Sequence, residues 1–94
     1  MSTPKAPADH FTILYFASAA SYTRKSFDHV AGPLETKKLF DHLESKYPGM
    51  KQKVLDSCAV TVNLDYIDID EKDDDGRLIQ AGDEVAIIPP VSSG

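Results

Sequence analysis

Only one segment of this 94-residue chain has the period of a long amphipathic helix. Between residues 35 and 47 the apolar positions repeat at i, i+1, i+4 and i+8, which is the spacing of one helical stripe. The stripe consists of Leu39, Phe40, Leu43 and Tyr47. Pro48 and Gly49 follow it directly and are typical residues for ending a helix. Because one helix covers only one face of a sheet, this feature limits how the other segments fold.

Strand patterns lie on both sides of this helix. FTILYF is rich in β-formers, CAVTVN alternates with period two, and EVAII is an apolar run that ends at two prolines. The predicted strands cover residues 11–16, 26–30, 58–63, 66–69 and 84–88. The first two are expected to pair as a hairpin, with a loop or a short helical turn (ASAASYTRKS) between them. Residues 50–57 predict another short helical turn.

The order of these elements, β-β-α-β-β-β, predicts an α+β fold. The economical arrangement is a mixed sheet curled around the one main helix, and ubiquitin has this architecture. The predicted domain covers residues 11–88. A flexible polar arm with two prolines precedes it at residues 1–10, and an extended tail follows it at residues 89–94.

The composition restricts the partners and the compartment. The length is that of one domain, and the net charge of −5 argues against nucleic acid and anionic membranes as partners. The start of the chain lacks the apolar core of a signal peptide, and no apolar run is long enough to span a bilayer. The single cysteine, Cys58, excludes a disulfide within the chain. These features predict a soluble protein of the cytosol.

The chain ends in a short tail, PPVSSG, directly after the last predicted strand. Pro89 and Pro90 remove two backbone donors, end the sheet ladder and direct the chain outward in extended form. Residues 89–94 span about 20 Å at roughly 3.3 Å per residue. Gly94 lacks a Cβ, so it can enter a narrow channel and present an unhindered carboxylate. Such a tail suits a carrier that is modified inside another protein, although a frayed end that stops at glycine has the same sequence.

Several segments together resemble one known family. They are LYFASAA near the start, YPG after the helix, VTVN, and above all AGDEVAIIPPVSSG at the end. In these segments the chain is similar to the small subunits of molybdopterin synthases, the MoaD/ThiS type of ubiquitin-like sulfur carriers. The resemblance runs from about residue 11 to residue 94, and GDEVAIIPPV is its most specific part.

The resemblance implies a function for the tail. In that family a ubiquitin-activating-type enzyme, an adenylyltransferase and sulfurtransferase, uses ATP to adenylate the terminal glycine, here Gly94. Sulfur then replaces one carboxylate oxygen and gives a thiocarboxylate. The tail inserts into the large catalytic subunit of molybdopterin synthase and donates sulfur to precursor Z, a cyclic pyranopterin monophosphate in molybdenum cofactor biosynthesis. The resemblance also implies a non-catalytic small subunit with no permanently bound cofactor, in a heterotetramer of two small and two large subunits.

The penultimate residue departs from the family pattern. The family ends in Gly-Gly, whereas Ser93 precedes Gly94 here, so a Cβ and a hydroxyl must pass where the family has none. Two alternatives therefore stand beside the molybdopterin function. One is a non-covalent ubiquitin-like adaptor with an inert terminus, and the other is a sulfur carrier for thiamin synthesis or transfer-RNA thiolation. The Pro-Pro-Val step before the terminus favours molybdopterin.

One face of the predicted sheet is a candidate partner surface. If Ile13 faces the core, the period of two turns Leu14 and Phe16 outward, and the same alternation turns Ala86 and Ile88 outward on the last strand. An exposed apolar patch usually marks a partner site, and the resemblance implies that the large subunit docks here. The predicted partner-binding residues are Phe16, Ile88, Pro89, Pro90, Val91, Ser92 and Ser93.

Acidic residues crowd one stretch late in the chain. They are Asp65, Asp68, Asp70, Glu71, Asp73, Asp74 and Asp75. A calcium loop needs acids at alternate positions, then a glycine, then a distant Glu between flanking helices. With Gly76 as the pivot the twelfth position is Gly82, and no flanking helices are evident. A solvated loop is therefore favoured, and no metal site is predicted.

The remaining reactive side chains belong to no recognisable motif. No histidine is placed to activate Cys58, which lies in a period-two strand and is interpreted as a buried structural thiol. His10, His29 and His42 share no ligand spacing and are interpreted as surface or loop residues.

Neutralising Asp73, Asp74 and Asp75 to Asn tests the interpretation of the acidic stretch. Because a solvated loop makes no essential contact, we expect intact pterin synthesis and a change in the free energy of unfolding of a few tenths of a kcal/mol at most. Thermal unfolding with and without calcium provides the measurement. A large calcium-dependent rise in the melting temperature of the native chain would instead indicate a metal site.

Overall fold

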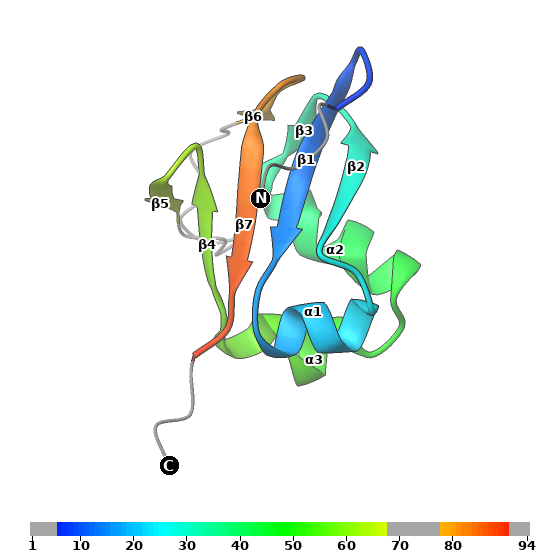
Figure 1. The fold of residues 1–94 in the computed structure, drawn as a ribbon, viewed down its shortest axis with the longest axis vertical. Coiled ribbons are helices and arrows are strands. Elements are labelled where there is room, and N and C mark those ends of the chain that lie inside the picture. Colours follow the sequence, from blue (N-terminus) through cyan, green and yellow to red (C-terminus); the bar gives the residue numbers. More distant parts are fainter. Residues whose placement is uncertain (1–5, 68–77, 91–94) are drawn as a thin grey trace.

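The computed structural model describes residues 6–67 and 78–90, which form a mixed sheet packed against helices (Figure 1). The main sheet has five strands in the order β2-β1-β7-β4-β5. They are β1 (His10–Tyr15), β2 (Phe27–Ala31), β4 (Ala59–Val62), β5 (Asp65–Ile67) and β7 (Glu84–Ile88). A second sheet pairs β3 (Leu34–Glu35) with β6 (Leu78–Ile79). The helices are α1 (Ser18–Thr23), α2 (Thr36–Lys46), α3 (Met50–Lys53) and the 3-10 turn η1 (Leu55–Ser57).

Most of the predicted elements are confirmed to within one or two residues. β7 has the predicted bounds, β1, β2, β4 and α2 differ from theirs by one residue at each end, and helical turns occupy the segments before β2 and β4. The predicted edge strand is β5, although residues 68–69 lie outside the described residues, as does most of the acidic stretch. The sequence does not predict β3 and β6, because a strand of two residues has no readable period.

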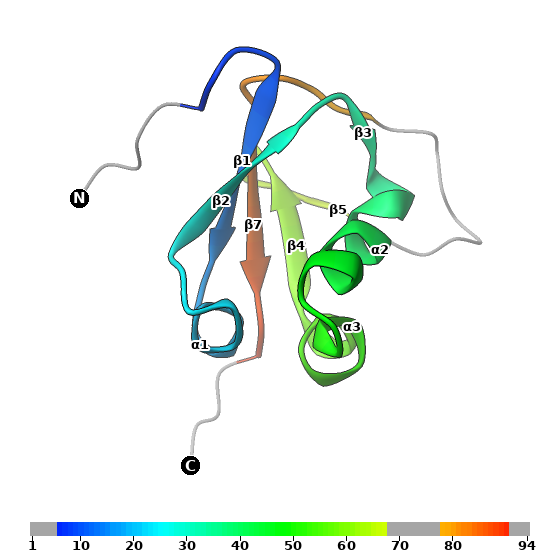
Figure 2. The same ribbon diagram turned by 90° about the vertical axis from the view of Figure 1, so that its right-hand side faces the viewer.

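The sheet is mixed because β1 and β7 run parallel, whereas its other neighbouring pairs are antiparallel. Helices α2 and α3 lie on one side of it (Figure 2). Leu39 and Leu43 of α2 are completely buried there, and Phe40 and Tyr47 pack against the same core. The strand residues that meet them are Phe11, Ile13, Tyr15, Val60, Val62, Val85 and Ile87. This arrangement confirms the predicted α+β fold, a mixed sheet wrapped on one main helix.

A buried carboxylate in β2 joins three parts of the fold. Asp28 accepts hydrogen bonds from the hydroxyl of Tyr15 in β1, at 2.8 Å, and from that of Tyr47 after α2, at 2.5 Å. The ammonium groups of Lys25 and Lys46 lie 3.1 and 3.3 Å from its Oδ1. The end of β1 is thereby fixed to the edge strand and to the main helix.

These contacts govern the ionisation of Asp28. Burial raises the pKa of this carboxyl, but hydrogen bonds from Tyr47, Tyr15, Lys25 and Lys46 outweigh burial and lower the pKa from 3.8 to about 2. The pKa values of the Tyr15 and Tyr47 phenols are raised. Burial is the larger cause, and the hydrogen bond to the Asp28 carboxylate is the next. At neutral pH a charged Asp28 therefore faces two neutral phenols.

The depressed pKa predicts a specific loss of stability in acid. Because the folded-state pKa lies below the unfolded value, the contribution of Asp28 is complete above about pH 4 and is lost as the pH falls through about 2. Across this window, we expect the free energy of unfolding to fall by about 2 kcal/mol more in the native chain than in Asp28→Asn. Urea unfolding at a series of pH values measures the difference.

Asp41→Asn is the matched control, because it removes an exposed carboxylate that pairs with the ammonium group of Lys51 at 2.8 Å. Exposed ion pairs contribute little, so this variant should keep the acid-induced drop of the native chain. Parallel pH profiles for the native chain and Asp28→Asn would contradict the role given to Asp28.

Candidate functional site

The two faces of the central strands differ in what covers them. The side chains of Ile13, Val85 and Ile87 face the helices and are completely buried. In the parallel register Leu14 lies beside Ala86, and both belong to the opposite face. The predicted alternation of β1 and β7 is confirmed, and the outward face carries no helix among the described residues (Figure 2).

An apolar groove of about 290 Å³ lies on this outward face, and we call it the sheet groove. Its walls are Leu14, Phe16, Thr61, Leu64, Tyr66, Glu84, Ala86 and Ile88. Phe16 has 46% of its surface accessible, and its backbone N–H donates to the carbonyl of Ile87 at 3.2 Å. The main chain at Phe16 is thus joined to β7, while the residue remains open to solvent.

Four residues of the sheet groove were not among those predicted, namely Thr61, Leu64, Tyr66 and Glu84. Leu64 and Tyr66, in and after the β4–β5 turn, are 85% and 75% exposed. Asn63 and Leu64 both have positive φ, at 50° and 73°, which aims a large apolar side chain out of a tight hairpin. The segment VNLDYI shows that an apolar residue lies in a turn. It does not show on which face of the sheet the side chains of this turn and of β5 lie, so the sequence did not predict these two residues.

The tail begins at the end of this groove. β7 ends at Ile88, next to the end of the sheet that α1 and α3 occupy (Figure 1). Pro89 is buried and Pro90 is exposed, so the first proline packs on its own domain and the second leads away from it. Val91, Ser92, Ser93 and Gly94 lie outside the described residues. The modification of Gly94 remains a prediction, and so do the partner contacts of Phe16, Ile88, Pro89, Pro90, Val91, Ser92 and Ser93.

Cys58 lies beside the start of the tail, because the next residue, Ala59, pairs with Ile88. Its thiol is half-buried and donates to the carbonyl of Leu55 at 3.3 Å. Burial raises the pKa of this thiol to about 11, so it is protonated at neutral pH. A protonated thiol is a poor nucleophile, which agrees with the structural role interpreted for Cys58, although its burial is only partial.

The other candidate ligands are dispersed. The ring Nδ1 of His10 lies 2.9 Å from the carbonyl of Ala8, and His29 stacks at a tilt on Phe27 in β2. Within residues 6–67 and 78–90, no three His, Cys, Asp or Glu side chains lie together as a metal site would require. The positions tested for calcium, residues 71–76, are outside these ranges. In the described part of the chain, no helix is long and apolar enough to cross a membrane.

A mixed five-stranded sheet wrapped on one main helix, with a tail after its central strand, defines a β-grasp protein of the ubiquitin-like class. The sequence signature of the ThiS family matches residues 13–94, nearly the whole chain. The chain belongs to the ThiS family.

Solved structures of the same architecture confirm the predicted β-grasp fold. SAMP1 from Haloferax volcanii superposes with a TM-score of 0.70 at 24% identity, covering 90% of this chain and 99% of the other. One chain of a protein–protein complex of subunits 1 and 2 of the molybdopterin-converting factor from Helicobacter pylori also superposes. Its TM-score is 0.61 at 20% identity, and the match covers 90% of this chain and 99% of the other.

Proteins of known name match with higher identity. The chain is 60% identical over 96 residues to the molybdopterin synthase sulfur carrier subunit of Phaeosphaeria nodorum, with all of both chains covered. It is 56% identical over 94 residues to the protein of the same name from Pyrenophora tritici-repentis, again with complete coverage. The resemblance identified from the sequence is thereby confirmed at the level of the family.

Proposed function

We propose that this chain is the sulfur carrier subunit of a molybdopterin synthase and that it acts in the cytosol through Gly94. The observation that carries the proposal is the 60% identity, over the complete length of both chains, to a protein of that name. The geometry supports it, because a rigid domain ends in a central strand and continues directly into the tail.

The proposed chemistry takes place on the terminal carboxylate. A carboxylate oxygen of Gly94 bonds to the α-phosphorus of ATP in an activating enzyme, and pyrophosphate leaves. A sulfur nucleophile at the oxidation level of sulfide then attacks the acyl carbon, and AMP leaves with the electron pair of the broken C–O bond. The product is a thiocarboxylate. Its sulfur bonds to precursor Z in the large subunit, and water then cleaves the acyl C–S bond, which leaves the sulfur on the pterin and restores the carboxylate of Gly94. Gly94 is therefore a tethered reactant, positioned by the partner.

The domain itself supplies docking rather than catalysis in this proposal. The Cys58 thiol, the one sulfur nucleophile in the sequence, is protonated and engaged with Leu55, which supports a non-catalytic role. ATP is used by the activating enzyme and is not held by this chain. The proposed assembly is a heterotetramer of two small and two large subunits, and the complex from Helicobacter pylori supports a large-subunit partner.

The sheet groove is the proposed contact with the large subunit. Changing Phe16 or Ile88 to Asp should weaken binding strongly, because the new carboxylate would lose its water in an apolar contact. Isothermal titration with the purified large subunit measures the affinity. Lys53→Asp, an exposed change on α3, is the control and should bind as the native chain does. Native affinity in both groove variants would place the interface elsewhere.

Deleting Gly94 should abolish sulfur transfer while the fold and the partner contact persist. The truncated chain still ends in a carboxylate, but on Ser93, about 3.3 Å short and beside a side chain. Reacting atoms tolerate far smaller displacements. Ser93→Gly is the reciprocal variant, and it should keep or raise activity because it removes a Cβ from the path. Mass spectrometry after incubation with the activating enzyme, ATP and a sulfur donor detects the replacement of oxygen by sulfur.

A Gly94 deletion that still acquires sulfur and yields pterin product would refute the role given to Gly94. A native chain that binds the large subunit but never acquires sulfur would favour the non-covalent adaptor. If the thiocarboxylate forms but sulfur passes only to a thiamin precursor or to transfer RNA, the chain is a carrier of another pathway.

A further inference from the structure

The large apolar side chains that the described chain exposes are gathered mostly at one place. Within residues 6–67 and 78–90 they are Phe16, Leu64, Tyr66 and Leu78. The first three line the sheet groove, whereas Leu78 lies in β6 and does not. Single exposed apolar residues are ordinary, but a contiguous group usually marks a contact with another protein. Leu64 is the most exposed member of this group, at 85%.

Leu64 occupies a position that favours glycine. Val62 pairs with Asp65, so Asn63 and Leu64 form the two-residue loop of the β4–β5 hairpin. Both have positive φ, at 50° and 73°, as a type I′ turn requires. The second position of such a turn is normally a glycine, because a Cβ is unfavourable at this φ. Asparagine tolerates the left-handed region and suits the first position, whereas a bulky leucine is an outlier in the second.

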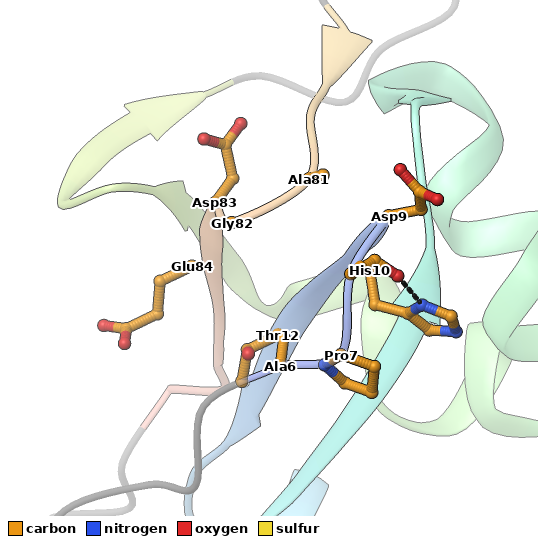
Figure 3. A pocket seen from close by; sticks show the side chains of 10 residues that line it. Ala6, Pro7, Asp9, His10, Thr12, Ala81, Gly82, Asp83 and Glu84 are labelled. Atoms are coloured by element: carbon orange, nitrogen blue, oxygen red, sulfur yellow. Dashed lines mark hydrogen bonds between the residues drawn. The ribbon is translucent and has the colours of Figure 1, made fainter.

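Asn63 holds this turn against the start of β7. Its backbone N–H donates to the carbonyl of Glu84 at 2.7 Å, and its side-chain oxygen accepts from the N–H of Glu84 at 2.9 Å. Its side-chain nitrogen donates to the carboxylate of Asp83 at 3.0 Å. Figure 3 shows Asp83 and Glu84 where β7 begins, on one wall of a cavity whose other wall is residues 6–10. These hydrogen bonds keep Leu64 in a conformation that leucine otherwise avoids.

Neither the exposure nor the backbone conformation of Leu64 stabilises the fold. An almost fully exposed side chain buries little apolar surface. A leucine in the left-handed region also costs conformational energy that glycine or asparagine would avoid. Residues that break a local rule without a gain in stability occur chiefly at functional sites.

Leu64 and the tail mark opposite ends of the sheet groove. Ala59 pairs with Ile88 at the end where the tail begins, and Asn63 binds Glu84 at the other end. Four steps along β7, about 13 Å, separate Glu84 from Ile88. A partner that is held only beside the tail can rotate about that contact. A second contact at this distance fixes the orientation of the partner and hence the direction in which the tail enters it.

We propose that Leu64 is an anchor for the large subunit and that its side chain inserts into an apolar hollow of that protein. This inference rests on the proposed function for the identity of the partner. The strained turn lowers the stability of the isolated domain but holds the side chain in one place, so that little conformational freedom is lost on binding. The partner surface that fits this hairpin is apolar and concave, because the side chain is an uncharged projection.

Leu64→Asn tests the anchor, because asparagine has nearly the shape of leucine but is polar and favours positive φ. We expect this variant to unfold about 4 °C above the native chain and to bind the large subunit about tenfold more weakly. Leu64→Gly should behave likewise. Leu64→Met keeps an apolar side chain in the same turn and should keep the native melting temperature and most of the affinity. Thermal unfolding by circular dichroism and isothermal titration provide the two measurements.

Leu78→Asn is the matched control, since it makes the same substitution at the exposed leucine outside the groove. It should bind the large subunit as the native chain does. A residue that acted only through the fold would shift stability and affinity in the same direction, so opposite shifts at Leu64 separate the two roles. Native affinity in Leu64→Asn and Leu64→Gly, or weaker binding together with a lower melting temperature, would overturn the proposal.

A second copy of this chain is the alternative occupant of the apolar hairpin. Sedimentation velocity of the native chain alone distinguishes the two, and we expect a monomer. A dimer that dissociates in Leu64→Asn would assign Leu64 to self-association and would contradict the anchor.

The outcomes separate this inference from the proposed function. If Phe16→Asp abolishes binding while Leu64→Asn binds as the native chain does, the anchor is wrong and the docking face stands. If the native chain does not bind the large subunit, the proposed partner and the anchor are both wrong.

Discussion

The parallel pairing of β1 with β7 is the contact on which this structure depends. It brings together the first and the last strand of the described chain at the centre of the sheet. One face of the pair forms the floor of the core under α2, and the other forms the sheet groove. The strand that leads into the tail is therefore among the most firmly held elements, with neighbours on both sides.

The carboxylates at the two ends of the central strands differ in their partners. Asp28 is buried among two phenols and two ammonium groups, so its charge is satisfied internally and stabilises the end of β1 beside Phe16. Glu84 and Asp9 at the other end of the sheet have no ion pair within the described chain. Asp28 thus stabilises the fold through its ion pairs, whereas Glu84 and Asp9 contribute no such pair within residues 6–67 and 78–90.

Local patterns predict those parts of the molecule in which a period is long enough to be read. The bounds of β7, the stripe of Leu39 and Leu43, and the outward facing of Leu14 and Phe16 all follow from periods of two or 3.6 residues. The contacts of Asp28 with Tyr15 and Tyr47 do not, because these neighbours are distant in sequence. The partner of a buried polar group depends on the topology of the fold, and a short sequence segment does not determine that topology.

The central place of β7 has a consequence for biosynthesis. A chain emerging from the ribosome has β1 and β2 early, but the sheet cannot close until the last strand has been made, because β7 separates β1 from β4. Contacts of such high sequence separation form late and slowly. An interrupted polypeptide therefore lacks the central strand and exposes its apolar faces to proteolysis. Because β7 lies between β1 and β4, only a chain translated through β7 completes the fold.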